Sequence, residues 1–194
     1  MTNNNTDNYF SQPDGDADNT LVIGGTMTVS GTVTTTGSQV RTGRQIITPI
    51  CGNAKVGATA GWVITAADNI SQGTLPQSQT SSTLVIPVTG LEIGDTITGV
   101  SVSGQVESAG GAVTLVMSVR KTVATAAGNT DAELGTDNVG SLTADTLISS
   151  ANLVVTGLTD VLAEGEAVYV LLTGTTAATT DIALNSIITT VTKS

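Results

Sequence analysis

The sequence predicts an all-β protein with an N-terminal extended arm, a short intertwined trimeric β-stalk and a C-terminal antiparallel β-sandwich of the jelly-roll kind. Three observations support this fold class. Thr, Val and Gly account for 36, 22 and 22 of the 194 residues, a composition that favours strands and turns over helices. A strict six-residue glycine period occupies 21–44, and short apolar runs with strand periodicity recur from residue 45 onward.

Residues 1–20 (MTNNNTDNYFSQPDGDADNT) are the predicted arm. The segment is rich in Asn and Asp, and it has too few apolar residues to bury a core of its own. Two of the four aromatic residues of the chain, Tyr9 and Phe10, nevertheless lie in it. We therefore expect the arm to be extended and to anchor the chain to another protein through Tyr9 and Phe10.

Three aspartates of the arm have the spacing that opens a calcium-binding loop: Asp14, Asp16 and Asp18. The later positions of such a loop do not fit, because its sixth residue is Asn19 instead of Gly and its twelfth is Gly25 instead of Glu. A solvated acidic linker is the favoured interpretation, and no metal site is predicted.

Residues 21–44 divide into the hexads LVIGGT, MTVSGT, VTTTGS and QVRTGR, each with glycine in fifth place. Each unit reads as a short β-segment closed by a turn in which glycine takes a positive φ. One copy would bury little and leave bare edges, whereas three intertwined copies would close the edges around an apolar axis. The alternative is a hairpin or meander of the main domain. The predicted stalk residues are Leu21, Ile23, Gly25, Met27, Val29, Gly31, Val33, Gly37 and Gly43.

Residues 45–194 are the predicted sandwich. Its expected strands are 45–50, 61–66, 83–89, 95–107, 112–123, 152–156, 167–173 and 182–192. Alternation places Leu84, Ile86 and Val88 on one face. We expect Pro87 at an edge or bulge, Gly99 at a bulge, 167–172 in a central strand and at most one helical turn near 131–134. The other strand with clear alternation places Val113, Leu115, Met117, Val119 and Val123 opposite Thr114, Ser118, Arg120 and Thr122.

Two segments of the sandwich resemble each other: VTGLEIGDTI at 88–97 and VTGLTDVLAEGEAV at 155–168. They predict two similar corners in which Asp95 and Glu166 solvate or hydrogen-bond the turns. A catalytic carboxylate pair is the alternative, but it requires a cleft and a raised pKa that the sequence does not indicate.

Four further residues are weighed as candidate sites. Cys51 has no histidine to activate it, so a buried and inert thiol is expected. Trp62, the only tryptophan, is expected in the core or at a subunit contact instead of serving as a sugar platform. Arg41 and Arg44 lie where stalk meets head, and pairing with acidic residues of the head is preferred over anion binding.

Composition excludes several classes of function. The formal net charge is −10, which argues against binding of nucleic acid, and the lack of histidine removes the usual catalytic triads and histidine-ligated zinc. No cofactor is predicted. No apolar run is long enough to span a membrane, and the polar N-terminus does not resemble a secretory signal.

The arm, the LVIGGTMTVSGTVTTTG hexads and the Thr/Gly/Val-rich sandwich together resemble trimeric fibre and decoration proteins of tailed bacteriophage virions. The resemblance implies a non-enzymatic homotrimeric head fibre or capsid decoration protein on the virion exterior. Its arm would bind the major capsid protein or another virion protein. The alternative is a short tail-fibre or attachment protein whose head binds a host glycan or receptor. The chain is too short for a polysaccharide-cleaving β-helix, and a hydrolase or lyase is the least favoured class.

Overall fold

The computed structural model describes residues 41–67 and 70–193. Its strands form two antiparallel sheets packed face to face, and the described residues contain no helix long and apolar enough to cross a membrane. The seven-stranded sheet comprises β1 (Arg41–Pro49), β3 (Val63–Ala67), β4 (Ile70–Leu75), β6 (Asp95–Ser108), β9 (Thr146–Ile148), β10 (Val154–Val161) and β12 (Thr180–Lys193). The five-stranded sheet comprises β2 (Lys55–Val56), β5 (Ser82–Pro87), β7 (Val113–Thr125), β8 (Gly128–Asn138) and β11 (Glu166–Thr176).

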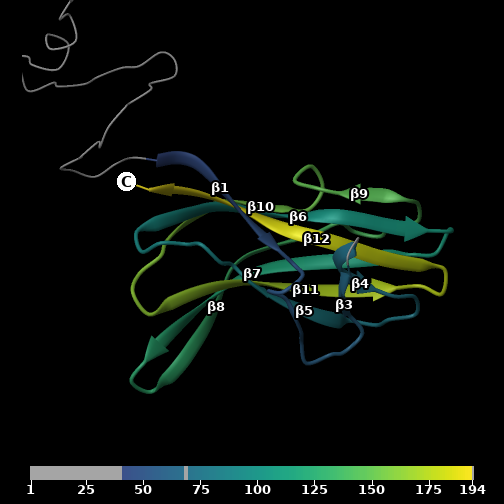
Figure 1. Ribbon diagram of the computed structural model, residues 1–194, viewed down its shortest axis with the longest axis horizontal. Helices are drawn as coiled ribbons and strands as arrows, with labels where there is room; N and C mark the ends of the chain where they lie inside the picture. The colour runs from purple at the N-terminus through teal and green to yellow at the C-terminus, as the bar shows by residue number, and fades with distance from the viewer. Residues whose placement is uncertain (1–40, 68–69, 194) are drawn as a thin grey trace, which may run out of the picture. The chain divides into compact units, whose positions relative to one another are not determined.

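Eight of these strands have jelly-roll topology (Figure 1). The order is β4-β12-β6-β10 in one sheet and β5-β11-β7-β8 in the other, and every neighbouring pair is antiparallel. Along the chain the strands alternate between the sheets except at the β7–β8 hairpin, as in a jelly roll. The predicted antiparallel jelly-roll sandwich is therefore confirmed. β1, β2, β3 and β9 extend the two sheets.

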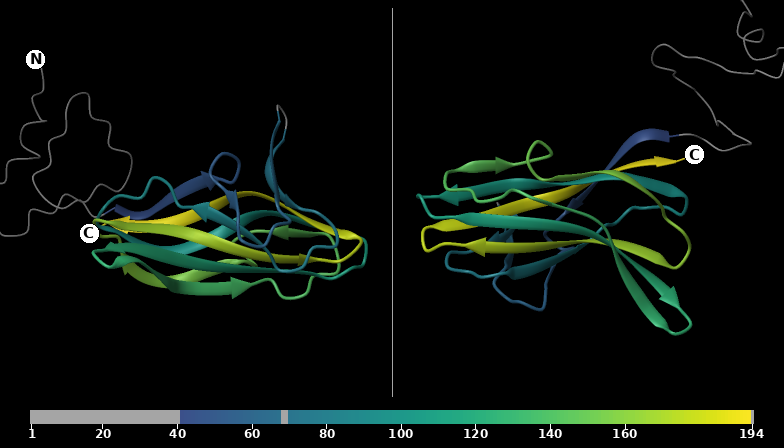
Figure 2. Two further views of the ribbon diagram at one scale, coloured as in Figure 1. Left: turned by 90° about the horizontal axis from the view of Figure 1, so that it is seen from below. Right: turned by 180° about the vertical axis from the view of Figure 1, so that it is seen from behind.

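The core lies between the sheets, and strand alternation supplies it. In β11 Val168, Val170 and Leu172 are buried, and β5 contributes Leu84 and Ile86. Because side chains alternate across a strand, the residues between them form the outer faces of the sandwich. Figures 1 and 2 show the end of β7 and the start of β8 projecting from one end of the sandwich as a hairpin. Residues 124–133 of this hairpin are exposed.

Three local predictions agree with the structure. β11, which contains 167–172, is the central strand of its sheet. Pro87 is the last residue of β5 and lies beyond the two residues that pair with β2, so its missing N–H costs no ladder bond. The registers of both neighbours of β6 shift between Ile97 and Gly99, which places a bulge at Thr98.

Other expectations need correction. Residues 131–134 belong to β8 and not to a helical turn, because pairing with β7 outweighs the weak helical preference of a few residues. β4 was not expected, since ISQGTL is polar and lacks a clear alternation. Cys51 is half-buried in the turn after β1 instead of lying in the core. β1 begins at Arg41 and therefore crosses the boundary predicted at residue 45.

Candidate functional site

One end of the sandwich, where β1 begins beside the end of β12, is called the junction end below. A fully buried carboxylate, Asp95, lies there. Its Oδ2 accepts hydrogen bonds from Arg44 Nη2 at 2.5 Å and from the backbone amide of Glu92 at 2.8 Å. Lys193 Nζ donates to Glu92 Oε2 at 2.7 Å. The prediction that Arg44 pairs with an acidic residue of the head is thus confirmed.

A second ionic cluster at the junction end is centred on Lys121. Its Nζ lies 2.9 Å from Asp160 Oδ1 and 3.0 Å from Glu166 Oε1. The hydrogen bond to Asp160 raises the pKa of Lys121 despite its burial. Glu166 Oε2 also accepts the backbone amide of Ala163 at 2.8 Å, and this bond, followed by that from Lys121, lowers the pKa of the Glu166 carboxyl.

These two clusters explain the internal resemblance in the sequence. Asp95 and Glu166 each accept the amide of the residue three positions before them, and each is preceded by a glycine with φ of 86° or 79°. Gly94 N donates to Leu162 O and Leu162 N donates to Asp95 O, both at 2.8 Å, so the two turns dock on each other. The prediction that these carboxylates hydrogen-bond their turns is confirmed.

A polar network lies on the outer face of the five-stranded sheet and contains the one tyrosine of the sandwich. Tyr169 Oη donates to Asp131 Oδ1 at 2.8 Å, and Arg120 Nε donates to Asp131 Oδ2 at 2.8 Å. Ser118 Oγ donates to Glu133 Oε2 at 2.7 Å. Register brings these residues together, because Arg120 lies opposite Tyr169 on one side and opposite Glu133 on the other. We call these five residues the Tyr169 network.

Hydrogen bonding and burial shift the pKa values of Asp131 and Tyr169 in this network. The hydrogen bond from Arg120 lowers the pKa of the Asp131 carboxyl, and the bond from Tyr169 acts in the same direction. Burial, supported by the bond to Asp131, raises the pKa of the Tyr169 hydroxyl. The network combines the ring and hydroxyl of Tyr169 and the guanidinium of Arg120 with the side chains of Asp131, Glu133 and Ser118. Such groups suit a polyhydroxylated ligand, which needs a flat apolar surface together with donors and acceptors.

The outer face of the seven-stranded sheet is different, because it holds an uncharged hollow of about 240 Å³. Within the described residues, no side chain that lines the hollow is ionisable. Its lining includes Gln45, Thr98, Ser101, Thr156, Ile188 and Thr190. This surface can therefore bind through hydroxyls and apolar contacts but not through charge.

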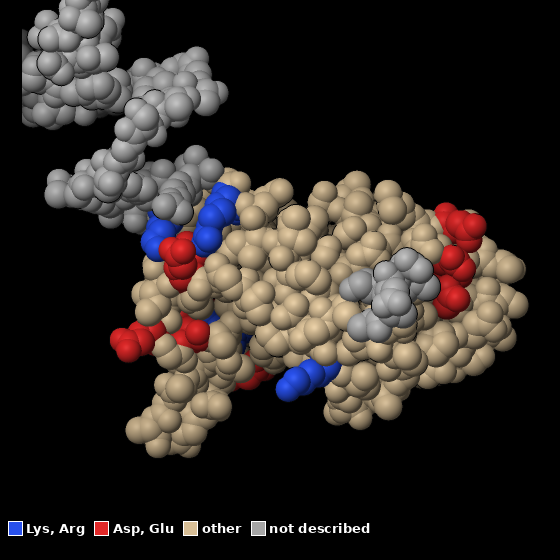
Figure 3. Space-filling model, viewed as in Figure 1, with Lys and Arg blue, Asp and Glu red and all other residues tan. Residues whose placement is uncertain are grey.

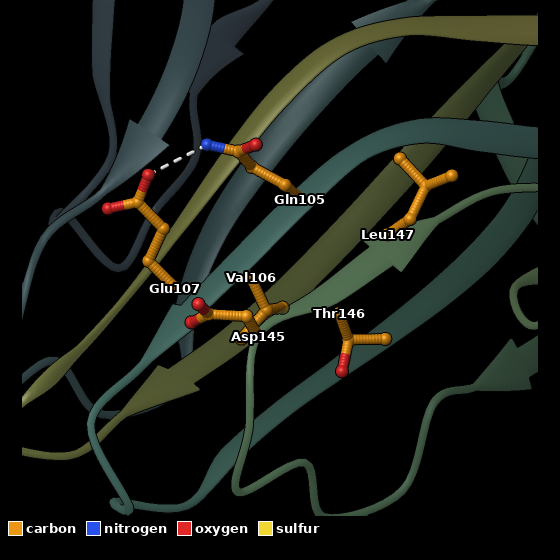
Figure 4. A pocket seen from close by; sticks show the side chains of 6 residues that line it. All are labelled: Gln105, Val106, Glu107, Asp145, Thr146 and Leu147. Atoms are coloured by element: carbon orange, nitrogen blue, oxygen red, sulfur yellow. Dashed lines mark hydrogen bonds between the residues drawn. The ribbon is translucent and has the colours of Figure 1, made fainter.

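A second hollow, of about 330 Å³, lies beside β9 at the end opposite the junction end (Figure 4). Gln105 Nε2 donates to Glu107 Oε1 at 2.8 Å, and Asp145 Oδ1 accepts the backbone amide of Ser108. Asp181 lies opposite Glu107 in the sheet. Figure 3 shows acidic side chains gathered at this end. Among the described residues, no group of three or more Asp, Glu, Cys or His is arranged to hold a metal ion.

The structure also places two further candidate residues, Trp62 and Gly43. Trp62 is buried in the core, and its Nε1 donates to Ser82 O at 3.0 Å, so the expectation of core packing is confirmed. Gly43 has a φ of 76° and lies in β1 where its register with β12 is irregular. The other predicted arm and stalk residues lie outside the described residues: Tyr9, Phe10, Asp14, Asp16, Asp18, Leu21, Ile23, Gly25, Met27, Val29, Gly31, Val33 and Gly37.

The Tyr169 network as a unit is not predictable from local sequence patterns. Alternation had placed Arg120 on the outer side of its strand, which was the available signal. Asp131 and Glu133 were expected outside a strand, so nothing placed their side chains beside Arg120. The hollow near Ile188 had no sequence signal, because its lining comes from four strands and a loop.

Comparisons with known proteins give structural similarities only. No protein-family model and no curated protein matches the chain. The CBM22-1 and GH10 modules of Clostridium thermocellum endo-1,4-beta-D-xylanase 10B, complexed with xylohexaose, are 16% identical, with a TM-score of 0.36 over 74% of this chain and 26% of theirs. The C-terminal family 22 carbohydrate-binding module of the same enzyme is 11% identical, with a TM-score of 0.34 over 75% of this chain and 85% of that module.

A viral protein is also among the similar structures. The enzymatically active domain of bacteriophage CBA120 tailspike protein 4 is 12% identical, with a TM-score of 0.32 over 75% of this chain and 19% of that chain. The chain thus spans about a quarter of the xylanase chain and about a fifth of the tailspike chain. Similarity at this level does not identify what the chain binds.

Proposed function

We propose that this chain is a non-enzymatic virion protein, a homotrimeric head fibre or capsid decoration protein whose sandwich is the exposed head. The observation that carries the proposal is the continuity of the glycine hexads with β1. The fourth hexad, QVRTGR, ends within β1, and its glycine, Gly43, has the positive φ expected of a hexad glycine. An overlap between the repeat and a strand of the head suits a fibre whose stalk continues into its head.

The proposed mechanism is mechanical. Three arms bind the virion surface and bury Tyr9 and Phe10, the hexads hold three chains in register, and the heads face solvent. Three chains carry three times −10, or −30. Together with a Thr- and Ser-rich surface, this charge hydrates the heads and repels other anionic particles.

Deletion of residues 1–20 is expected to abolish attachment to the virion while leaving a folded trimer. The arm contains Tyr9 and Phe10, the proposed anchor, whereas the hexads and the sandwich are retained in the truncated chain. Occupancy on particles that lack the fibre, measured by quantitative electrophoresis after sedimentation, tests this expectation. A Tyr9→Ala, Phe10→Ala chain of full length is the matched variant and is expected to lose most of its occupancy.

Two results would contradict the proposal. If truncated protein decorates particles at wild-type occupancy, the arm is not needed for attachment. If the full-length chain is monomeric at micromolar concentration in light scattering, the proposed trimer does not form.

A second candidate function is glycan binding by the head of an attachment fibre, and the Tyr169 network is the observation that favours it. The network combines a half-buried ring with Arg120, Asp131 and Glu133 on a solvent-facing sheet, a combination that can stack on a sugar ring and bond its hydroxyls.

Under this second candidate, Tyr169→Ala is expected to reduce binding to an array of bacterial surface polysaccharides by about tenfold, the effect typical of removing an aromatic anchor. Tyr169→Phe keeps the ring and loses the hydroxyl with its bond to Asp131, so it is expected to retain most of the binding. Val116→Ala, on the same outer face but outside the network, is the control. Full-length protein that binds no polysaccharide on the array would reject this function.

A further inference from the structure

The outer face of the seven-stranded sheet is unusual for so acidic a chain. Seven large apolar side chains are exposed among the described residues, and four of them point outward from this sheet: Ile47, Val63, Leu147 and Val161. Their direction follows from alternation. Ile47 precedes the buried Thr48, for example, and Val161 pairs with Thr96, which lies between the buried Asp95 and Ile97.

Among the residues that the structure describes, charge is absent from the middle of the same face. Around Ile47 the outward residues of β1, β12 and β6 are Thr, Ser, Gln, Gly, Pro and Ile, and the hollow of about 240 Å³ lies among them. Outward-facing carboxylates of these strands appear only at the far end, at Glu107 and Asp181. In Figure 3 most charged side chains on the visible side lie toward the two ends, apart from one cationic side chain at the lower edge.

The net charge restricts how copies of this chain can meet. Each copy carries −10, and like charges brought together at a contact cost several kcal/mol. The cores of protein interfaces are depleted of charged residues for this reason. The outer face of the five-stranded sheet carries Arg120, Asp131 and Glu133, whereas the middle of the other outer face can be covered without burying a charge of any described residue.

We propose that the outer face of the seven-stranded sheet, centred on Ile47 and Ile188, is the surface through which the heads of three copies contact one another. The occupant is a second copy because the hexads run into β1, which belongs to this sheet, so a stalk would hold the chains at this sheet. The inference rests on the proposed trimer and adds the contact face between its heads.

The geometry suits a cyclic trimer, in which each subunit uses two different patches. Ile47, 63% exposed on β1, is a projecting apolar side chain, and it lies opposite Ile188, which lines the hollow. One copy can therefore present its β1 side chain to the hollow of the next copy. The hydroxyl of Thr190 flanks the contact and can bond across it.

Ile47→Glu in the full-length chain tests the contact, with Val116→Glu on the opposite outer face as the control. Val116 is also an exposed strand residue, at 40%. Ile47→Glu places three carboxylates in the contact of one trimer, and we expect it to weaken trimer association at least about tenfold in sedimentation equilibrium. Val116→Glu is expected to change association less than about twofold. Equal association of the two variants would overturn the contact face while leaving the trimer intact.

Thiol labelling provides a measurement that does not depend on weakening the trimer. In a Cys51→Ser background, the thiol introduced by Ile47→Cys is expected to react with a maleimide at least about tenfold more slowly than that introduced by Val116→Cys. Equal labelling rates in a confirmed trimer would overturn the inference. This includes the case in which the thiol at position 47 becomes protected only on the virion. A monomeric wild-type chain would instead reject the proposed trimeric function on which the inference rests.

Discussion

Replacing Arg44 with methionine is expected to lower the free energy of unfolding of the sandwich by about 3 kcal/mol, the cost typical of leaving a buried charge without its partner. Asp95 has no exposed surface, and Arg44 supplies the cation bound to its Oδ2. Its other oxygen, Oδ1, has no hydrogen-bond partner among the described residues. In the variant, the amide of Glu92 remains as a donor to this carboxylate, and one amide does not compensate a buried negative charge.

A second substitution, at Asp95, completes a double-mutant cycle. It separates the effect of the unpaired charge from the effect of lost packing by Arg44. Asp95→Asn keeps an oxygen for the Glu92 amide and removes the charge, so Arg44→Met combined with Asp95→Asn is expected to recover most of the loss. Chemical denaturation of the wild type, both single variants and the double variant gives the coupling between the two residues. A double variant as unstable as Arg44→Met alone would show that packing of Arg44, and not the unpaired carboxylate, carries the effect.

Local sequence patterns were sufficient to predict most of the long strands of the sandwich. β5 and β7 were predicted because alternating apolar residues at 84–88 and 113–119 mark one buried face, and these residues are buried. The bulge in β6 was predicted from a single glycine, Gly99, because glycine inside a strand pattern weakens regular pairing. Each of these features depends on neighbours within a few residues in the sequence.

Features that depend on register were not predicted. β8 has little apolar alternation of its own, and its place in the sheet comes from ten residue pairs with β7. Once β8 was missed, Asp131 and Glu133 had no position relative to Arg120, and the Tyr169 network was not visible. The resemblance of 88–97 to 155–168 did predict two similar corners, because the turn carboxylate and the glycine before it are local features.

Gly43 links the described part of the chain to the hexads that precede it. It is the fourth hexad glycine, and its φ of 76° lies in the left-handed region that residues with a Cβ rarely adopt. A Cβ added there would meet no atom within 4 Å, so backbone conformation and not space is what a side chain would violate. The same hexad position in the preceding units is occupied by Gly25, Gly31 and Gly37.

Replacing Gly31 and Gly37 with valine is therefore expected to abolish the proposed trimer at micromolar concentration. A left-handed conformation costs an L-residue about 1–2 kcal/mol, and two substitutions in three chains place six such residues in one assembly, or about 6–12 kcal/mol. A penalty of that size weakens association by more than about 10⁴-fold.

Ser30→Val with Thr36→Val is the matched control, because it adds the same side chains one position earlier in each hexad, where no positive φ is expected. Sedimentation velocity of the two double variants and the wild type compares their association directly. If the glycine variant remains as fully trimeric as the control, the hexads do not form a β-stalk whose turns require glycine. A monomeric glycine variant beside a trimeric control would assign association to these turns, because both proteins gain two valines but only one of them loses hexad glycines.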